Sequence, residues 1–272
     1  MKSYLDFNAL EMFENYMKMV GTPLLSDEET EEKRLYGKKI GLVNAASWIQ
    51  LWCYYFGRLH LPGVKLINVG NEAVQLHFMK AFQQGEQCPP QRNIEIFSNY
   101  ATEVAELNGG VDAIMVTCST MNRSYPAVKK AVEPYGIPVI TIDQPLMESA
   151  VRIGGKILII ATVQTTVDNT KKLLEETAMA FGKSESLEYS GAVVEEAFSL
   201  LGEGRITDHN ELIANEIRKA QEKDAIDQVV LAQLSMSVFK LSYPNPESSF
   251  GIPVLTSGDE GFKKLKEILL EQ

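Results

Sequence analysis

The chain repeats part of its own sequence at a constant spacing. Residues 111–121, VDAIMVTCSTM, align without a gap with residues 226–236, IDQVVLAQLSM, which begin 115 positions later. The sequence GIPV occurs at 136–139 and again at 251–254, also 115 positions apart. Because two separate motifs share one offset, the sequence predicts a structural unit that occurs twice in the chain.

A weaker similarity extends the repeat toward its start, because residues 37–43 resemble residues 154–160 at an offset of 117. In each copy, short apolar runs alternate with helical patterns, which is typical of a parallel sheet with helices on both faces. We therefore expect an α/β fold of two pseudosymmetric lobes, each a four-stranded parallel sheet flanked by helices, with the active site in the cleft between them. The predicted strands are residues 40–44, 64–69, 113–117 and a segment from Pro138, then 157–162, roughly 186–190, 228–232 and a segment from Pro253.

Residues before the repeat are predicted to form a helical arm packed on the first lobe. Leu10, Phe13, Met17 and Val20 recur at helical spacing and form one apolar face. Residues 26–29, SDEE, have the pattern of a capping box that opens a further, acidic helix. The predicted division is an arm of residues 1–36, a first lobe of residues 37–143 completed by the C-terminal helix 258–272, and a second lobe of residues 144–257.

The composition and net charge of the chain exclude some classes of binding partner. Hydrophobic residues make up 45% of the 272 residues and charged residues 23%, the balance of an ordinary globular protein. The net charge of -10 argues against nucleic acids and anionic membrane surfaces as partners, so a small molecule is expected. No apolar run reaches the roughly 18 residues of a membrane span and no signal-peptide pattern is present, which predicts a cytoplasmic protein. Homo-oligomerisation is left open.

The three cysteines predict free thiols. Cys53, Cys88 and Cys118 are odd in number and widely spaced, so neither a disulfide framework nor a zinc site is indicated. Cys53 lies in an aromatic helical stripe and is predicted to pack in the core, while Cys88 precedes two prolines and is predicted to lie in a loop. Cys118 differs from both, because it directly follows a predicted strand and precedes hydroxyl side chains.

The carboxyl ends of parallel strands usually carry the ligand site. Cys118 and Gln233 occupy equivalent positions in the two copies, so they are expected to approach one cleft from opposite sides if the lobes face each other. Polar residues at the strand ends are the candidate substrate-binding residues: Asn44, Ser47, Thr117, Ser119, Thr120, Thr162, Thr165, Thr166, Gln233 and Ser235.

The chemistry of a thiol suits proton transfer next to a carboxylate. Removal of that proton creates an enediolate, so the site needs a base near the carbon and hydrogen-bond donors around the oxygens. A free thiol has a pKa of about 8.5, which a helix N-terminus or a nearby cation lowers. Cys118 is therefore the predicted catalytic residue, although a lone cysteine after an apolar strand is also a common core residue.

Other polar residues have a structural interpretation beside a functional one. Thr165, with Asp168 three residues on, is predicted to be a helix N-cap, and a ligand contact is the alternative. Asn44 either orients a carboxylate or closes a turn. Arg123 is predicted to be an exposed or structural arginine, and His209 to lie at the start of a solvated helix. No histidine has metal-ligand spacing, and no metal or cofactor is predicted.

Four segments resemble the cofactor-independent aspartate/glutamate/hydantoin racemase superfamily, which also contains arylmalonate decarboxylase and maleate isomerase. The resemblance runs from about residue 37 to residue 256. Its members consist of two pseudosymmetric α/β lobes, and its racemases carry one cysteine on each. Cys118 falls on the first of these positions, but Gln233 occupies the second and cannot transfer a proton as a thiol does. The segments are TCST at 117–120, ID at 142–143 followed by ESAVRIGG at 148–155, ATVQTT at 161–166, and LAQLSM at 231–236.

The sequence and the resemblance together predict a cofactor-independent isomerase of the racemase or epimerase type. It would act on a small carboxylate or related carbonyl compound by proton transfer from Cys118 at the α-carbon. A single-cysteine decarboxylase or cis-trans isomerase of the same superfamily is an alternative, because either needs chemistry at one face only. A non-catalytic two-lobed ligand-binding protein is the alternative from another class. The sequence does not determine which substrate is used.

Overall fold

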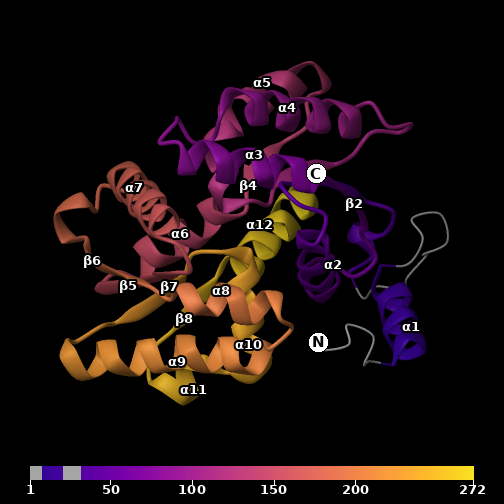
Figure 1. Cartoon of the computed structure of the whole chain (residues 1–272). Helices are drawn as coiled ribbons and strands as arrows, with labels where there is room; N and C mark the ends of the chain where they lie inside the picture. The colour runs from indigo at the N-terminus through magenta and orange to yellow at the C-terminus, as the bar shows by residue number, and fades with distance from the viewer. Residues whose placement is uncertain (1–7, 21–31) are drawn as a thin grey trace.

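The two copies of the repeat fold as successive series of strands and helices (Figure 1). The structure is a computed structural model that describes residues 8–20 and 32–272. The first elements are α1 (Ala9–Val20), η1 (Lys33–Leu35), β1 (Lys39–Asn44), α2 (Ile49–His60), β2 (Lys65–Gly70), α3 (Glu72–Gln83), α4 (Gln91–Ala105), β3 (Ala113–Val116), η2 (Ser119–Ser124), α5 (Tyr125–Val132), η3 (Glu133–Tyr135), β4 (Val139–Thr141) and α6 (Asp143–Ile153).

The second copy has the same order of strands and main helices, with an additional 3-10 turn, η4, before its second strand and the helix α11 in place of η3. Its elements are β5 (Lys156–Ala161), α7 (Gln164–Ala180), η4 (Ser184–Ser186), β6 (Glu188–Val193), α8 (Glu195–Gly202), α9 (Ile206–Lys223), β7 (Gln228–Leu231), η5 (Leu234–Val238), α10 (Phe239–Ser242), α11 (Pro246–Phe250), β8 (Val254–Thr256) and α12 (Ser257–Glu271).

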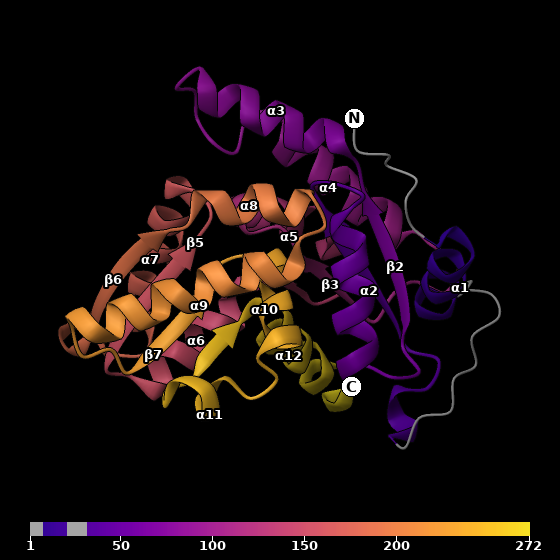
Figure 2. The same cartoon turned by 60° about the horizontal axis from the view of Figure 1, so that its bottom comes forward.

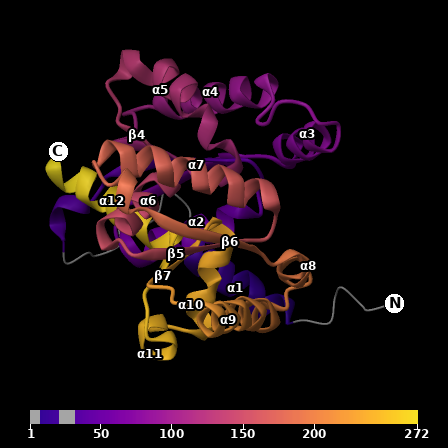
Figure 3. The same ribbon diagram turned by 90° about the vertical axis from the view of Figure 1, so that its left-hand side faces the viewer.

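The described residues form two four-stranded parallel sheets with the same strand order. The first sheet has the order β2-β1-β3-β4 and the second has the order β6-β5-β7-β8. Every strand pair in both sheets is parallel, so the prediction of an α/β fold with two four-stranded parallel sheets is confirmed. Figure 3 shows α4 and α5 of the first copy and α9 of the second at opposite ends of the molecule.

The register of the sheets reproduces the sequence repeat. Asp112 accepts a hydrogen bond from the backbone N–H of Lys39 at 2.7 Å, and Asp227 accepts one from Lys156 at the same distance. Each aspartate thus ties the start of the central strand to the loop before the third strand. The glycine of each GIPV motif ends a short helix in the left-handed conformation, which favours glycine at that position. The repeat therefore encodes shared backbone geometry.

The helices α6 and α12 lie at equivalent places in the repeat, and each packs on the sheet of the other copy. Leu146 and Ala150 of α6 belong to the buried cluster of the second sheet. Phe262 and Leu265 of α12 belong to the buried cluster of the first sheet, with Ile40 of β1. Because each sheet receives an amphipathic helix from the other copy, the two lobes share a hydrophobic interior and α12 runs between them (Figure 1).

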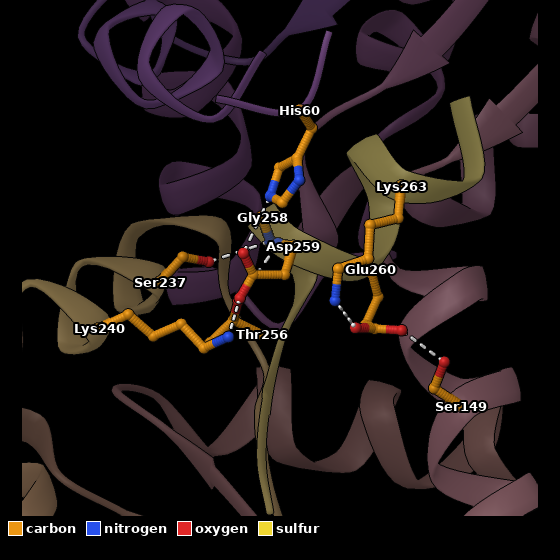
Figure 4. A network of polar contacts seen from close by, with 9 residues as sticks. All are labelled: His60, Ser149, Ser237, Lys240, Thr256, Gly258, Asp259, Glu260 and Lys263. Carbon is orange, nitrogen blue, oxygen red and sulfur yellow. Dashed lines mark hydrogen bonds and ion pairs between the residues drawn. The ribbon is translucent and has the colours of Figure 1, made fainter. Parts of the chain in front are cut away.

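A network of charged and polar groups fixes the start of α12 where the lobes meet (Figure 4). Asp259 accepts hydrogen bonds from His60 of α2, at 2.9 Å, and from Lys240 of α10. Burial by itself would raise the pKa of Asp259, but the hydrogen bonds and charges of His60 and Lys240 hold it well below its usual value. On the other side of α12, Ser149 of α6 donates to Glu260 at 2.6 Å.

The helix α1 leaves its apolar side chains exposed. Leu10, Phe13 and Met17 are all exposed, although they follow the predicted helical spacing. Arg58 of α2 donates to the carbonyl of Met19 at 3.1 Å, which connects the end of α1 to the first lobe. The capping box predicted at residues 26–29 lies outside the described residues. Within the part of the chain that the structure describes, no helix combines the length and the hydrophobicity needed to cross a membrane.

Several predicted strand bounds differ from the observed ones by one residue, and two boundaries and the environment of one side chain differ more. The second strand of the second copy runs from Glu188 to Val193 and not from about residue 186, because the 3-10 turn η4 occupies residues 184–186. The helix α7 begins at Gln164, and Val163 is its N-cap, so the prediction that Thr165 is the N-cap is wrong. The prediction of a solvated His209 is also wrong, because this side chain is buried in α9 beside Asn210.

Candidate active site

A cavity of about 380 Å³ lies where the ends of β3 and β7 approach each other. Cys118 and Gln233 both line it, and each is the extended residue that directly precedes a 3-10 turn. The equivalence predicted from the repeat therefore places one thiol and one amide at a single cavity. Other predicted substrate-binding residues that line the cavity are Thr117, Ser119, Thr120, Thr162, Thr165 and Ser235.

The Cys118 thiol is half-buried among hydrogen-bond donors. Its Sγ lies 3.1 Å from Oγ1 of Thr120, and the backbone N–H groups of Thr120 and Met121 also stabilise the thiolate. Burial nevertheless dominates and raises the pKa of Cys118 above the ordinary value of a thiol. At neutral pH the group is therefore mainly a thiol, and the thiolate is the minor form that can accept a proton.

A buried carboxyl group lies behind the Cys118 turn. Asp143, the first residue of α6, accepts a hydrogen bond from Nδ2 of Asn122 at 2.5 Å. Burial raises the pKa of Asp143 to about 6, and hydrogen bonds from Asn122, Ser119 and Ser257 act in the opposite direction. The negative charge of Asp143 in turn contributes to the raised pKa of Cys118. The sequence showed Asp143 only as part of a family-like motif, because its burial depends on the packing of α6.

The Gln233 side chain is held in one orientation by Thr162. Its Oε1 accepts hydrogen bonds from the backbone N–H of Thr162 at 2.7 Å and from the Thr162 hydroxyl at 2.9 Å. Because the oxygen is engaged, the Nε2 group is the part of the amide that can donate to a ligand in the cavity. An amide has no titratable proton in the ordinary pH range, so the described residues on this side of the cavity offer hydrogen bonds and no acid or base.

Apolar side chains that the sequence did not single out form the rest of the cavity wall. They come from the start of α2, from α3 and from α8, and Figure 2 shows α3 of the first copy extending above α8 of the second. Their helical periodicity is visible in the sequence, but it does not show which faces turn toward the cleft. These side chains are Trp48, Ile49, Phe78, Met79, Phe82 and Phe198.

Three predicted substrate-binding residues do not line this cavity. Asn44 is completely buried, where it donates to Asn68 at 3.1 Å and accepts from Cys53 at 3.3 Å and from Thr117. It therefore supports the strand end from behind. Ser47 faces a separate groove and donates to Glu72, and Thr166 is buried beside the neighbouring cavity of α6 and α7.

The remaining cysteines and Arg123 lie outside the cavity. Cys53 is buried in α2, as its aromatic surroundings predicted, and burial raises its pKa to about 12. Cys88 is half-buried in the loop before α4. Arg123 is exposed and pairs with Glu176 at 2.9 Å, in agreement with the predicted structural role. Among the residues that the structure describes, no group of three or more His, Cys, Asp and Glu side chains could hold a metal ion.

The fold and the cavity are those of a two-lobed α/β protein with one site between its lobes. Two parallel α/β lobes enclose a site that holds a thiol at one strand end and an amide at the equivalent end of the other copy. Residues 74–265 match the Asp/Glu/Hydantoin racemase family. The chain therefore belongs to the Asp/Glu/hydantoin racemase family, and the racemases that give the family its name are isomerases.

Solved structures of racemases have the same fold. A glutamate racemase isoform from Bacillus anthracis is 20% identical, with a TM-score of 0.59 over 86% of this chain and 82% of that chain. An aspartate racemase homologue from Pyrococcus horikoshii is also 20% identical, with a TM-score of 0.63 over 86% and 99%. An allantoin racemase from Pseudomonas fluorescens is 14% identical, with a TM-score of 0.55 over 86% and 91%. A comparison with curated protein sequences finds no significant match.

Proposed function

We propose that this protein is a cofactor-independent isomerase of the racemase or epimerase type, in which Cys118 transfers the proton at the α-carbon of a small carboxylate or related carbonyl compound. One observation supports this proposal above the others. Cys118 is the only titratable side chain among the described residues that line the cavity. Its thiol sits among hydroxyl and backbone donors that can also hold the substrate oxygens.

The proposed step moves one proton and one electron pair. The Cys118 thiolate accepts the α-proton, so that the C–H bond breaks, an S–H bond forms and the electron pair enters the enediolate. Ser119, Thr120 and Ser235 supply hydroxyl groups, and Gln233 supplies amide donors, for the oxygens that gain charge. Return of the proton from the thiol restores the starting configuration. Inversion requires a proton at the opposite face, where the cavity has Gln233, so water would supply it.

Solvent exchange tests this proposal directly. In deuterated water, the protein is expected to replace the α-hydrogen of its substrate with deuterium, which NMR measures without knowledge of the product. Cys118→Ala should abolish the exchange, while Cys88→Ala should retain it because Cys88 lies in the loop before α4. Equal exchange by Cys118→Ala and the unmodified protein would overturn the assignment of the thiol.

A second candidate function is supported by the environment of Gln233. Thr162 fixes the amide, and no second acid or base faces Cys118 among the described lining residues. A reaction that needs proton transfer at only one face of the substrate carbon would therefore require no group beyond Cys118 and Gln233. A single-cysteine decarboxylase, in which Cys118 protonates the enediolate left by loss of carbon dioxide, or a cis-trans isomerase meets this condition. Release of carbon dioxide from substituted malonates would distinguish the decarboxylase from the racemase or epimerase.

A further inference from the structure

The cavity around Cys118 has a polar end and an apolar end. The strand ends contribute the hydroxyl groups, the thiol and the Gln233 amide. The helices α2, α3 and α8 contribute mainly aromatic and aliphatic side chains, together with the amides of Gln75 and Gln83 on α3. The indole N–H on the apolar side has a partner, because Nε1 of Trp48 donates to Oε1 of Gln75 at 3.0 Å. The indole ring therefore presents an apolar surface without an unmet hydrogen-bonding demand.

None of the described residues that line this cavity carries a charge. The neighbouring cavity, which shares Ser119, provides a comparison within the molecule, because its lining includes Arg123, Glu148, Glu176 and Lys264. An amino-acid zwitterion brings an ammonium group that must leave water when it enters. Without a carboxylate in the described lining, no opposite charge compensates for the lost hydration of that ammonium, and only neutral acceptors are available to it.

The apolar end also carries large side chains that remain accessible. Met79 and Phe82 of α3 are 44% and 51% exposed, and Phe198 of α8 is 41% exposed from the other copy. Residues of both helices line the cavity, and Figure 2 shows α3 above α8. A ligand that contacts both helices removes apolar surface from water on each, which favours an apolar substituent over a charged one.

We propose that the substrate is a carboxylate or related carbonyl compound with a bulky apolar substituent, such as an aryl group, and without an ammonium group. Its oxygens contact the Ser119, Thr120 and Gln233 end, and its substituent lies against Phe82 and Phe198. The identity of the reacting centre in this inference rests on the proposed function of Cys118. The preference for an apolar substituent rests on the walls of the cavity alone.

Calorimetric binding to the Cys118→Ala variant tests the preference without turnover. The probes are 2-phenylpropionate, with one carboxylate and a phenyl group, and L-aspartate and L-glutamate as zwitterions. We expect 2-phenylpropionate to bind at least tenfold more tightly than either amino acid. Phe82→Ser and Phe198→Ser should each weaken 2-phenylpropionate binding about tenfold, because each removes one aromatic wall. Met179→Ser is the matched control, since Met179 is 70% exposed on α7 and lies outside the lining.

The outcomes separate the two proposals. Tighter binding of aspartate or glutamate, absence of 2-phenylpropionate binding, or equal effects of the Phe82, Phe198 and Met179 substitutions would overturn the inference. None of these results removes the proposed role of Cys118. Exchange of the α-hydrogen of an amino acid for deuterium would still support that role. Conversely, if 2-phenylpropionate binds as expected but the unmodified protein exchanges no α-proton in any bound ligand, the inference holds and the proposed function fails.

Discussion

The turns at Cys118 and Gln233 have the same place in the repeat and different chemical surroundings. Each follows the third strand of its copy and precedes a 3-10 turn. The Cys118 sulfur contacts Thr120 and lies near the buried charge of Asp143. The position equivalent to Asp143 in the second copy is Gly258, where even a Cβ atom would come within 2.8 Å of Oγ of Ser237. One turn can therefore tune a proton-transfer group, while the other can only hold and orient an amide.

The largest expected effect is the loss of catalysis when the thiol is removed. Cys118→Ala should lower kcat for α-proton exchange by about a thousandfold, because general acid-base groups contribute on the order of 100 to 10,000-fold. The corresponding change in the other turn, Gln233→Ala, should retain exchange at a reduced rate. A similar loss in both variants, measured by NMR in deuterated water, would show that the two turns do not differ in the proposed way.

The next effect concerns the junction at the start of α12. Asp259→Asn leaves Lys240 and His60 without their charged partner, so the free energy of unfolding should fall by about 3 kcal/mol at neutral pH. Because the pKa of Asp259 is lowered in the folded protein, this contribution exists above the pKa of the unfolded carboxyl, about 4, and is lost as pH falls below it. Urea unfolding at several pH values measures both results.

Glu267→Gln is the control for that measurement. Glu267 also pairs with a lysine on α12, at 2.8 Å, but its side chain is 61% exposed. Exposed ion pairs contribute little to stability, so the free energy of unfolding should change by less than about 1 kcal/mol. Equal effects of the two substitutions would contradict a special role for the junction.

Asp143→Asn should stabilise the protein at neutral pH. The pKa of Asp143 is raised to about 6 in the folded state, so its burial costs no ionisation energy below about pH 4. Above that pH the cost grows until about pH 6, and it is constant at higher pH. The asparagine variant avoids this cost, which a shift of roughly two pKa units places on the order of 3 kcal/mol before relaxation of the site. The difference in unfolding free energy between variant and unmodified protein should vanish near pH 4. A constant difference between pH 4 and pH 8 would contradict the raised pKa.

The hydrogen bonds of the Gln233 turn should have the smallest effect on catalysis. Gln233→Leu removes the amide donors from the cavity and should raise KM about fivefold, because a hydrogen bond contributes about 1 kcal/mol. Thr162→Val keeps the amide and the hydrogen bond from the backbone N–H to its oxygen, and removes only the bond from the hydroxyl, so its effect on KM should be smaller, about threefold. A larger effect of Thr162→Val than of Gln233→Leu in steady-state kinetics would show that Thr162 has a direct role.

The sequence predicted the parts of the molecule that depend on local patterns. The offset of 115 and the short apolar runs predicted two parallel sheets, because strands in such sheets are buried on both faces. The convergence of strand ends predicted that Cys118 and Gln233 would share a cavity. The strand at Glu188–Val193 was misplaced, since its residues are only partly buried and lack a continuous apolar run.

The parts that were missed depend on how helices pack in three dimensions. Phe82 and Phe198 lie in amphipathic helical patterns, which do not show what their apolar faces contact. Only the orientation of α3 and α8 brings the two side chains to one cavity. Thr165 has the composition of an N-cap, but the backbone of Val163 takes that position. Asn44 ends a strand as predicted, yet its hydrogen bonds to Asn68, Cys53 and Thr117 direct it into the interior.

The stereochemistry of deuterium incorporation tests the central claim most directly, namely that proton transfer by cysteine occurs at one face only. Each enantiomer of a substrate is incubated in deuterated water, and exchange and inversion are followed together by NMR and chiral chromatography. One enantiomer is expected to exchange with retention faster than it inverts, because Cys118 serves its face and water serves the other. Gln233→Cys should narrow this difference. Exchange and inversion of both enantiomers at similar rates by the unmodified protein would contradict the account and require a second base opposite Cys118.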